Sequence, residues 1–250
     1  MLARPERKLY YWLTSEWMQG VGDVVELGTF VGGSTAHLAA GHAAAGHSGL
    51  VHAYDKFSSG TKLKRDLLYA NGIAPFDGSD ILPLARELLA PWDGRVAFHQ
   101  GNIEELGWPG GTIELLLVDA FKKVDLIDRM TADFFTALIP GQSLLVHQDF
   151  GHWTQPWLVS QMIRFRDAFE PLAFVPDDTM VFLCRKPVDA ERLAAARVGG
   201  LSDADIQRDL DAAMDWLAPF ELQDRLAVMK RGLALNPGTR IAWKMANRPW

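Results

Sequence analysis

The chain has 250 residues, of which 48% are hydrophobic and 22% are charged, and its formal net charge at pH 7 is −6. This composition is typical of a globular protein and excludes a disordered or fibrous chain. The net acidity disfavours nucleic acid as a partner, because binding to phosphates requires a basic surface. No apolar run reaches the roughly 18–20 residues needed to cross a bilayer, so we expect no membrane segment.

The first residues and the cysteine content favour a cytoplasmic location. The N-terminal segment is basic, but Glu6, Arg7 and Lys8 interrupt any apolar core of a secretion signal. Cys184 is the single cysteine, which excludes an internal disulfide and a zinc cluster built on several thiolates. We therefore expect a cytoplasmic enzyme in which Cys184 is an inert strand residue.

Helical and apolar patterns alternate along the first hundred residues. A helix is expected over 5–19, because Leu9, Leu13 and Trp17 recur at helical spacing. The elements predicted after it are a strand at 24–28, a helix at 35–46 capped by Ser34, a strand at 50–55, a mobile loop region with a short helical piece at 58–80, a helix at 81–92 and a strand at 96–100.

The alternation continues to residue 186. The predicted elements are a strand at 113–119, a helix at 124–138, a strand at 143–149, a helix at 156–168, and two strands at 172–178 and 179–186 that form an antiparallel hairpin. Alternating strands and helices imply right-handed βαβ units and a parallel sheet with helices on both faces. We predict an α/β fold with a Rossmann-like doubly wound sheet, mostly parallel, ending in an antiparallel C-terminal hairpin.

The sequence changes character after Pro187 and contains no further clear strand. Helices are predicted at 189–197, 203–217 and 220–234, the second beginning with a pattern that resembles a capping box, Ser202 to Asp205. The chain thus divides into an N-terminal helix (1–20), a ligand-binding Rossmann-like domain (21–187) and a helical C-terminal appendage (188–250). Because the appendage is rich in apolar residues, we expect it to support a homodimer or to cover the site.

Glycines and acids follow the predicted strands, where a doubly wound sheet binds its ligands. The first loop has the spacing Gly-x-x-x-Gly-Gly, not the Gly-x-Gly-x-x-Gly of dinucleotide folds, which disfavours a pyrophosphate site. Asp55 follows the second strand, where an acid can accept hydrogen bonds from the hydroxyls of a ribose. The other strand ends carry Gly101-Asn102-Ile103, Asp119 and His147-Gln148-Asp149.

These segments resemble the class I S-adenosylmethionine-dependent methyltransferases. The resemblance rests on Glu26-Leu27-Gly28-Thr29-Phe30-Val31-Gly32-Gly33-Ser34 followed by Tyr54-Asp55, and is nearest to the macrocin-type small-molecule O-methyltransferases. Further matching segments are Asp55-Lys56-Phe57, Asp119 and Gln148-Asp149-Phe150-Gly151. The similarity covers about residues 21–186. It implies methyl transfer from S-adenosylmethionine to a hydroxyl of a small molecule, such as a sugar, a phenol or another natural product.

The resemblance also implies roles for single residues. Glu26, Gly28 and Ser34 would shape or touch the methionine part of the cofactor, and Asp55 would hold its ribose. Phe57 would flank the adenine, and Asn102 and Ile103 would meet its edge. Asp119 would lie near the sulfonium and the acceptor hydroxyl. The remaining cofactor-binding residues that it implies are Thr29, Phe30, Gly33, Lys56, Ala120 and Phe121.

The resemblance further implies a magnesium ion bound by carboxylates after the fourth and fifth strands. Asp119 and Asp149 would be its ligands, since Mg²⁺ prefers oxygen donors. The chain has Phe121 and Gln148 where the relatives carry further acids. We therefore favour a metal-free site, while a Mg²⁺ site at Asp119 and Asp149 stays open.

Four residues are candidates for catalysis: Asp119, His147, Asp149 and His152. Either histidine is a candidate general base, because the charge of histidine changes near pH 7. Trp153 and Trp157 are spaced as neighbours on a helix, and they either floor a flat substrate pocket or pack in the core. Six basic residues are predicted to be solvated, with the alternative that they hold an acidic substrate: Lys56, Lys62, Lys64, Arg65, Lys122 and Lys123.

Two other functions stay open. A nicotinamide-dependent oxidoreductase uses the same kind of sheet, but the sequence lacks Gly-x-Gly-x-x-Gly and a Tyr-x-x-x-Lys pair. A catalytically degenerate partner subunit would keep the nucleotide-binding fold without the acids for catalysis. The cofactor that stabilises the protein against heat distinguishes these functions.

Overall fold

The computed structural model describes residues 2–250, and the chain divides into two compact units, Met1–Leu106 and Gly107–Trp250. The first unit contains three parallel strands, β1 (Asp23–Leu27), β2 (Val51–Asp55) and β3 (Val96–Gln100). All three lie where the sequence predicts them, because short apolar runs there end in glycine or acidic residues. The predicted boundary near residue 187 stays a prediction.

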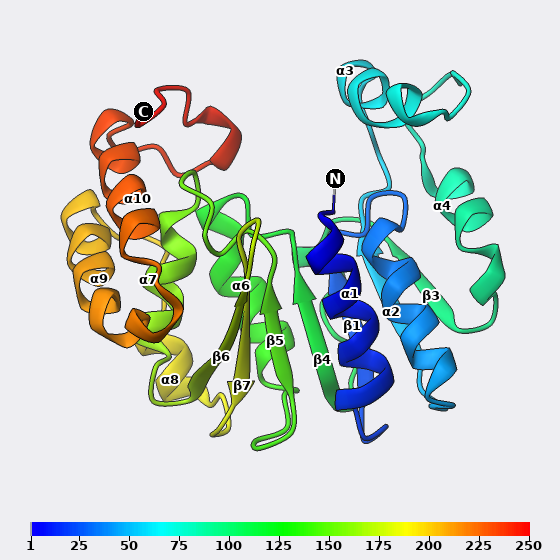
Figure 1. Ribbon diagram of the computed structural model, residues 1–250, viewed down its shortest axis with the longest axis horizontal. Coiled ribbons are helices and arrows are strands. Elements are labelled where there is room, and N and C mark those ends of the chain that lie inside the picture. The colour runs from blue at the N-terminus through cyan, green and yellow to red at the C-terminus, as the bar shows by residue number, and fades with distance from the viewer. Residues whose placement is uncertain (1) are drawn as a thin grey trace. The chain divides into compact units, whose positions relative to one another are not determined.

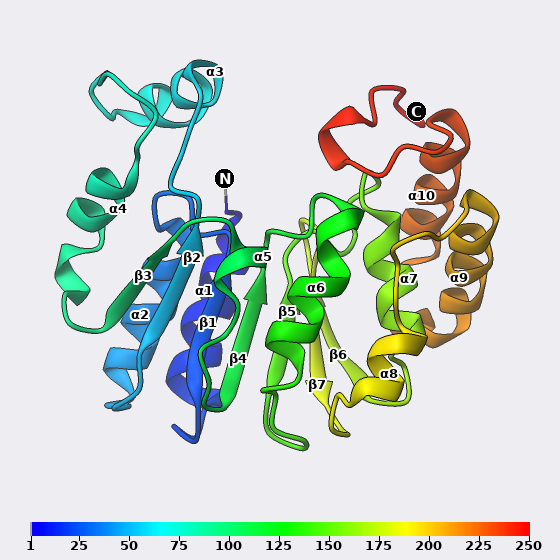
Figure 2. The ribbon, with the colours of Figure 1, turned by 180° about the vertical axis from the view of Figure 1, so that it is seen from behind.

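Two helices lie side by side on one face of these strands (Figures 1 and 2). They are α1 (Arg4–Trp12), which continues as a π-helical turn over Leu13–Trp17, and α2 (Gly33–Ala44). Gly41 permits their close approach, since a Cβ there would overlap with Thr14 Oγ1 and the carbonyl oxygen of Tyr11. The prediction that Ser34 caps α2 is wrong, because the cap is Gly32 at a φ of 90°.

The predicted loop region at 58–80 contains more helix than one short piece. Its elements are α3 (Thr61–Leu63), a π-helical turn at Lys64–Leu68 and a 3₁₀ turn at Tyr69–Asn71. Lys64 is buried rather than solvated, and its Nζ donates to the carbonyl oxygens of Phe76 at 2.9 Å and Gly78 at 2.7 Å. The helices that follow are α4 (Leu82–Leu88), a 3₁₀ turn at Ala90–Trp92 and α5 (Ile103–Leu106). The sequence predicted a helix over 81–92 but did not predict α5.

The second unit contains parallel and antiparallel strands. They are β4 (Ile113–Val118), β5 (Leu144–His147), β6 (Phe169–Val175) and β7 (Thr179–Cys184). The strand order is β3-β2-β1-β4-β5-β7-β6, with β5 parallel to β4 and antiparallel to β7, and β7 antiparallel to β6. Every residue of β4 and β7 is buried, as expected for strands covered on both faces. The predicted α/β Rossmann-like sheet with an antiparallel C-terminal hairpin is confirmed.

Helices cover the strands of this unit. Helix α6 (Val124–Phe135) lies in front of β5 in Figure 2 and behind it in Figure 1. The others are α7 (Pro156–Arg164), α8 (Ala190–Ala195), α9 (Asp203–Trp216), α10 (Gln223–Leu235) and 3₁₀ turns at Ala218–Phe220 and Ala242–Lys244. The predicted helical character of the tail is confirmed, and so is the capping box, in which Ser202 and Asp205 bond reciprocally.

Most apolar side chains of α9 and α10 are buried within the unit, whereas Leu235, Trp243 and Trp250 of the tail are exposed. Helix α7 packs against both α9 and α10. The tail residues buried there include Leu210, Leu217, Leu226, Met229 and Leu233. Their apolar surface therefore gives no argument for a second subunit, and the homodimer stays a prediction from the sequence alone.

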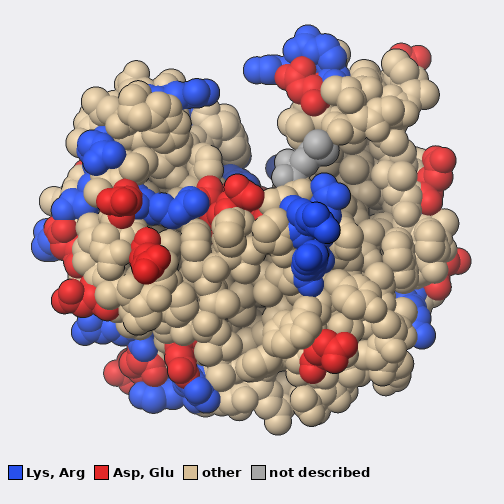
Figure 3. Space-filling model, viewed as in Figure 1, with Lys and Arg blue, Asp and Glu red and all other residues tan. Residues whose placement is uncertain are grey.

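Many charged residues of the second unit form ion pairs. On the face drawn in Figure 3, basic and acidic side chains lie side by side over much of the helical part of the second unit. Pairs of this kind include Arg208 with Asp205 and Lys230 with Asp211. None of the helices in residues 2–250 combines the length and the hydropathy required to cross a bilayer.

Candidate functional site

The loop after β1 is a tight turn bound to the end of β2. Gly28, Phe30 and Gly32 adopt positive φ angles of 104°, 52° and 90°. The amides of Gly28 and Thr29 both donate to the carbonyl oxygen of Tyr54, at 2.9 and 3.2 Å. Glycine adopts such angles without strain, whereas Phe30 requires support from its surroundings.

Asp55 provides that support. Its Oδ2 accepts the backbone N–H of Phe30 at 2.8 Å, and its Oδ1 accepts the backbone N–H of Phe57 at 2.7 Å. Phe57 also has a positive φ, 48°, so one half-buried carboxylate holds a left-handed residue in each of two loops. Asp55 therefore shapes the loops after β1 and β2, a role that the sequence did not predict. Its predicted contact with a ribose stays a prediction.

Glu26 ties the end of β1 to the first turn of α2. Its carboxylate is fully buried and accepts the hydroxyl groups of Ser34 and Thr35, and that of Thr29 at 3.3 Å. A buried carboxylate requires hydrogen-bond donors of this kind. Glu26 and Ser34 therefore act on the shape of the loop, while exposed Gly33 begins the helix.

The residues predicted around an adenine lie in different environments. The ring of Phe57 is fully buried against Leu68, Ile81 and Ala85. Ile103 is also buried, in the first position of α5. The neighbouring Asn102 donates from Nδ2 to Glu105 Oε1 at 2.9 Å, and Lys56 is exposed. Contact of these residues with a cofactor stays a prediction.

Three charged side chains of the second unit meet after β4 and β5. The ammonium of Lys122 donates to one carboxylate oxygen of Asp119 and to one of Asp149. Gln155, which is buried, donates from Nε2 to Asp149 Oδ2 at 2.6 Å. Lys122 is thus an ion-pair partner with a half-buried side chain, a pairing that the sequence analysis did not predict. Its spacing of three residues from Asp119 was the available signal.

This donor set does not fit the magnesium ion that the resemblance implied. Lys122 places a positive charge between Asp119 and Asp149. Among residues 2–250, no three or more His, Cys, Asp and Glu side chains are grouped to hold a metal. Mg²⁺ takes near-octahedral oxygen coordination, and an ammonium beside both ligands would repel it. Asp119 and Asp149 instead form ion pairs with the ammonium of Lys122.

Phe121 and Ala120 follow Asp119 and lead into the core. Phe121 is buried, and its ring stacks on that of Phe135 at a centroid distance of 6.3 Å. Its carbonyl oxygen accepts Trp157 Nε1 at 3.0 Å. Trp157 is therefore a core residue, as one of the two predictions for it stated, and Ala120 is half-buried.

His147 lies in an aromatic cage. The rings around it belong to Phe121, Phe135, Phe150 and Phe182. Burial lowers the pKa of His147 from 6.5 to about 3, and its ring nitrogens have no hydrogen-bond partner among the described residues. A general base must reach the proton that it takes. This burial argues against His147 as the base.

His152 is differently placed. It is half-buried, and its Nδ1 lies 2.7 Å from Thr154 Oγ1. Burial is the main cause that lowers its pKa; the charges of Lys122 and Arg225 also lower it, and Asp178 opposes them. The imidazole is therefore neutral at pH 7 and able to accept a proton.

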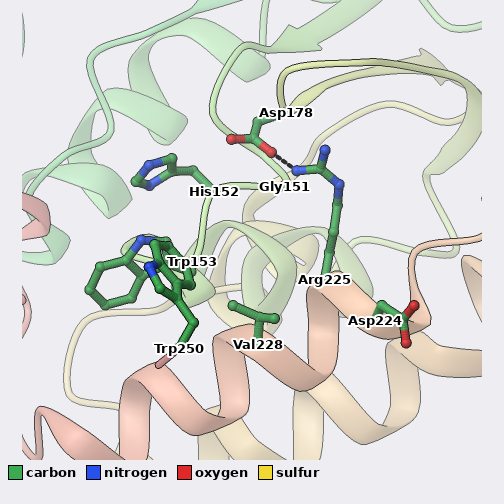
Figure 4. A pocket seen from close by; sticks show the side chains of 8 residues that line it. All are labelled: Gly151, His152, Trp153, Asp178, Asp224, Arg225, Val228 and Trp250. Atoms are coloured by element: carbon green, nitrogen blue, oxygen red, sulfur yellow. Dashed lines mark hydrogen bonds and ion pairs between the residues drawn. The ribbon is translucent and has the colours of Figure 1, made fainter. Parts of the chain in front are cut away.

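His152 lines a cavity of about 520 Å³ (Figure 4). The lining residues come from the loop after β5, the β6–β7 turn, α10 and the end of the chain: Gly151, His152, Trp153, Asp178, Asp224, Arg225, Val228 and Trp250. The sequence analysis named His152 as a candidate base and Trp153 and Trp157 as a candidate pocket floor; the other lining residues come from distant segments and were not predicted. Of the two tryptophans considered together, Trp153 lines the cavity and Trp157 does not.

No protein-family model matches the chain, and no curated protein has significant sequence similarity to it. Many solved structures are similar in fold, including the following three. The O-methyltransferase NovP has a TM-score of 0.52 at 16% identity, over 72% of this chain and 78% of that one. The S-adenosylhomocysteine-bound Podospora anserina methyltransferase PaMTH1 has 0.50 at 13% identity (74% and 80% covered), and cofactor-bound Rv0187 from MTB has 0.50 at 20% (74% and 82% covered). The chain therefore has the fold of the class I S-adenosylmethionine-dependent methyltransferases.

Proposed function

We propose that this protein transfers a methyl group from S-adenosylmethionine to a hydroxyl group of a small molecule. The observation that carries the proposal is the loop after β1, with positive φ at Gly28, Phe30 and Gly32 and a hydrogen bond from Phe30 to Asp55. This loop and Asp55 are the segments by which the sequence resembles the methyltransferases. They lie on a sheet of the same fold.

The first unit has the groups that such a cofactor requires. When bound, S-adenosylmethionine supplies an electrophilic methyl group on its sulfonium. Gly28, at a φ of 104°, permits a tight turn beside such a ligand, whereas Gly32 packs against Leu89. Half-buried Asp55 offers a negative charge to ribose hydroxyls. Glu26 holds the helix that follows in place through Ser34 and Thr35.

The second unit has groups that act on an acceptor hydroxyl. Methyl transfer mainly requires alignment of donor and acceptor and removal of the acceptor proton. His152 is neutral, lines the cavity and takes that proton in our proposal. Lys122, held by Asp119 and Asp149, stabilises the negative charge that develops on the acceptor oxygen. The reaction then needs no metal ion.

Other parts of the proposal rest on the sequence. We keep the cytoplasmic location, the absence of a nucleic-acid partner and the homodimer as predictions. Sedimentation of the full chain tests the dimer directly. The nicotinamide alternative is disfavoured by the spacing of Gly28, Gly32 and Gly33, which lacks the dinucleotide pattern.

Transfer of label from methyl-labelled S-adenosylmethionine to phenols tests the proposal. We expect labelled methyl ethers from the wild-type chain. His152→Ala should lower kcat by about 10²-fold or more, the usual contribution of a general base. His47→Ala, a histidine outside the cavity lining, is the matched control and should keep full turnover. Label transfer that is equal in the His152 variant would remove this residue from the mechanism.

A further inference from the structure

We propose that the cavity lined by Trp153, His152 and Trp250 is the acceptor pocket, and that it binds a neutral, planar aromatic molecule carrying a hydroxyl group. This inference rests on the proposed function and specifies its substrate class. The cavity volume of about 520 Å³ lies in the range of small-molecule sites, roughly 300–1,000 Å³. Figure 4 shows the indoles of Trp153 and Trp250 close together, with His152 beyond them.

One loop connects this cavity to the charged cluster of the same unit. Asp149, which pairs with Lys122, accepts the backbone N–H of His152 at 3.1 Å through its carbonyl oxygen. Gln155 donates its backbone N–H to the carbonyl oxygen of His152 at 3.0 Å and its side chain to Asp149 at 2.6 Å. His152 also interacts electrostatically with Asp178 and with Lys122. An acceptor in the cavity therefore lies beside groups that can take its proton.

The aromatic walls suit a flat ligand. The rings of Trp153 and Trp250 meet edge to face, with centroids 5.7 Å apart and planes at 78°. His152 stacks on Trp153 at 6.3 Å and 28°. Trp250 is 73% exposed, so its large apolar face is available to a ligand. Aromatic molecules pack against such rings both edge to face and stacked.

The position of the Trp153 indole depends on Gly232, a glycine in α10. A Cβ at Gly232 would lie 2.7 Å from Trp153 Cε3, closer than carbon atoms can pack. The absence of a side chain at Gly232 thus lets the indole rest against the helix. The wall of the cavity is therefore fixed by packing and does not depend on a ligand.

The turn between β6 and β7 forms another fixed wall. Asp177 and Asp178 have positive φ angles of 74° and 88°, which non-glycine residues adopt at a cost. Gly151 donates its backbone N–H to the carbonyl oxygen of Asp178 at 2.9 Å, and a Cβ at Gly151 would lie 2.9 Å from Asp178 Oδ1. The close contact of the two loops holds Asp178 in its strained conformation.

The charges of the lining favour a neutral acceptor. Arg225 pairs with Asp178, as the dashed line in Figure 4 marks, and its guanidinium lies 5.1 Å from the centroid of the Phe174 ring. The positive charge of Arg225 is thus already neutralised by Asp178, another residue of the lining. Asp224 adds a second carboxylate at an exposed position. An acidic ligand would meet a net negative lining and pay desolvation without gaining a new partner.

Three probes of similar size separate these features: 2-naphthol, its saturated analogue 2-decalol, and 6-hydroxy-2-naphthoate, which adds a carboxylate. We would titrate each into the full chain in the presence of saturating S-adenosylhomocysteine and measure heat. We expect 2-naphthol to bind at least tenfold more tightly than either analogue. Tighter binding of the naphthoate would overturn the neutral class, and equal binding of the decalol would overturn the aromatic class.

Variants test the place of binding. Trp153→Leu and Gly232→Ala should each raise the Kd for 2-naphthol at least tenfold, the second by displacing the indole of Trp153. Trp243→Leu is the matched control. Trp243 is an exposed tryptophan near Trp250 in the sequence, but it does not line the cavity. Circular dichroism verifies that each variant folds. Unchanged affinity in both cavity variants would overturn the assignment.

Binding of S-adenosylhomocysteine, measured in parallel, separates this inference from the proposed function. If S-adenosylhomocysteine binds and 2-naphthol does not, the pocket assignment is wrong and the proposed function stands. If 2-naphthol binds in a Trp153-dependent manner and S-adenosylhomocysteine does not, the proposed function is wrong and the aromatic pocket is supported as a site of its own.

Discussion

Replacing Asp55 with asparagine measures how much one carboxylate contributes to the first unit. The two oxygens of Asp55 accept separate backbone N–H groups, at 2.8 Å from Phe30 and 2.7 Å from Phe57. Asparagine has one carbonyl oxygen, so its amino group must face one of these N–H donors. A hydrogen bond to a charged group contributes about 1.5–3 kcal/mol. At about 2–4 °C per kcal/mol for a chain of this size, the Tm should fall by roughly 3–12 °C.

Thermal unfolding followed by circular dichroism measures this change. Asp77→Asn is the control, because Asp77 is an exposed acid of the same unit, and its Tm should stay within about 2 °C of wild type. Calorimetry below the Tm should show weaker binding of S-adenosylhomocysteine to the Asp55 variant. The weaker binding follows from the ribose contact that the resemblance implies for Asp55, and the lower stability follows from its two backbone contacts. An unchanged Tm together with unchanged affinity would refute the reasoning.

The remaining predictions concern the second unit. Lys122→Met should lower kcat and move the acid limb of the pH–rate profile to higher pH, because the charge of Lys122 adds to burial in lowering the pKa of His152, the proposed base; an unmoved profile would contradict this. His147 has a pKa of about 3 in the folded chain, below its ordinary 6.5, so its contribution to stability is complete above pH 6.5 and is lost as the pH falls towards 3. Urea titrations at several pH values give the free energy of unfolding, and His147→Leu should reduce its slope with pH by up to about 1.4 kcal/mol per pH unit. The variant should keep its turnover at pH 7; a folded variant without turnover would return His147 to the site. Excess EDTA should leave turnover unchanged, and a complete loss restored by Mg²⁺ would show Asp119 and Asp149 to be metal ligands.

The order of strands and helices was predictable because the strands are short apolar runs; β1 and β3 are followed by glycine, and β2 and β4 lead to an acid. The run Ile113–Val118 is an example, buried at every position. The glycine loop and Asp55 were recognisable for the same local reason, since a turn at Gly28 and an acid after β2 leave a pattern in the sequence. The helix at 103–106 escaped prediction because a single turn has no periodicity to detect.

Contacts between distant residues were not predictable. Asp119 and Asp149 were considered as metal ligands and catalytic acids, whereas the structure pairs both with Lys122. The sequence predicted His147 as a candidate base near Asp149, but its side chain is packed among four phenylalanine rings. The pocket wall made by Asp178 and Arg225 joins residues 47 positions apart, a pairing that no local pattern encodes.

Titration calorimetry of the full chain with S-adenosylhomocysteine and, separately, with NADH tests the central claim most directly. A ligand at about 100 times its Kd should also stabilise the chain by about 2.7 kcal/mol, which supplies an independent thermal readout. We predict saturable binding of S-adenosylhomocysteine with a stoichiometry near one per chain, weakened in the Asp55→Asn variant, and no heat from NADH. Binding of NADH alone would contradict the account and support the oxidoreductase.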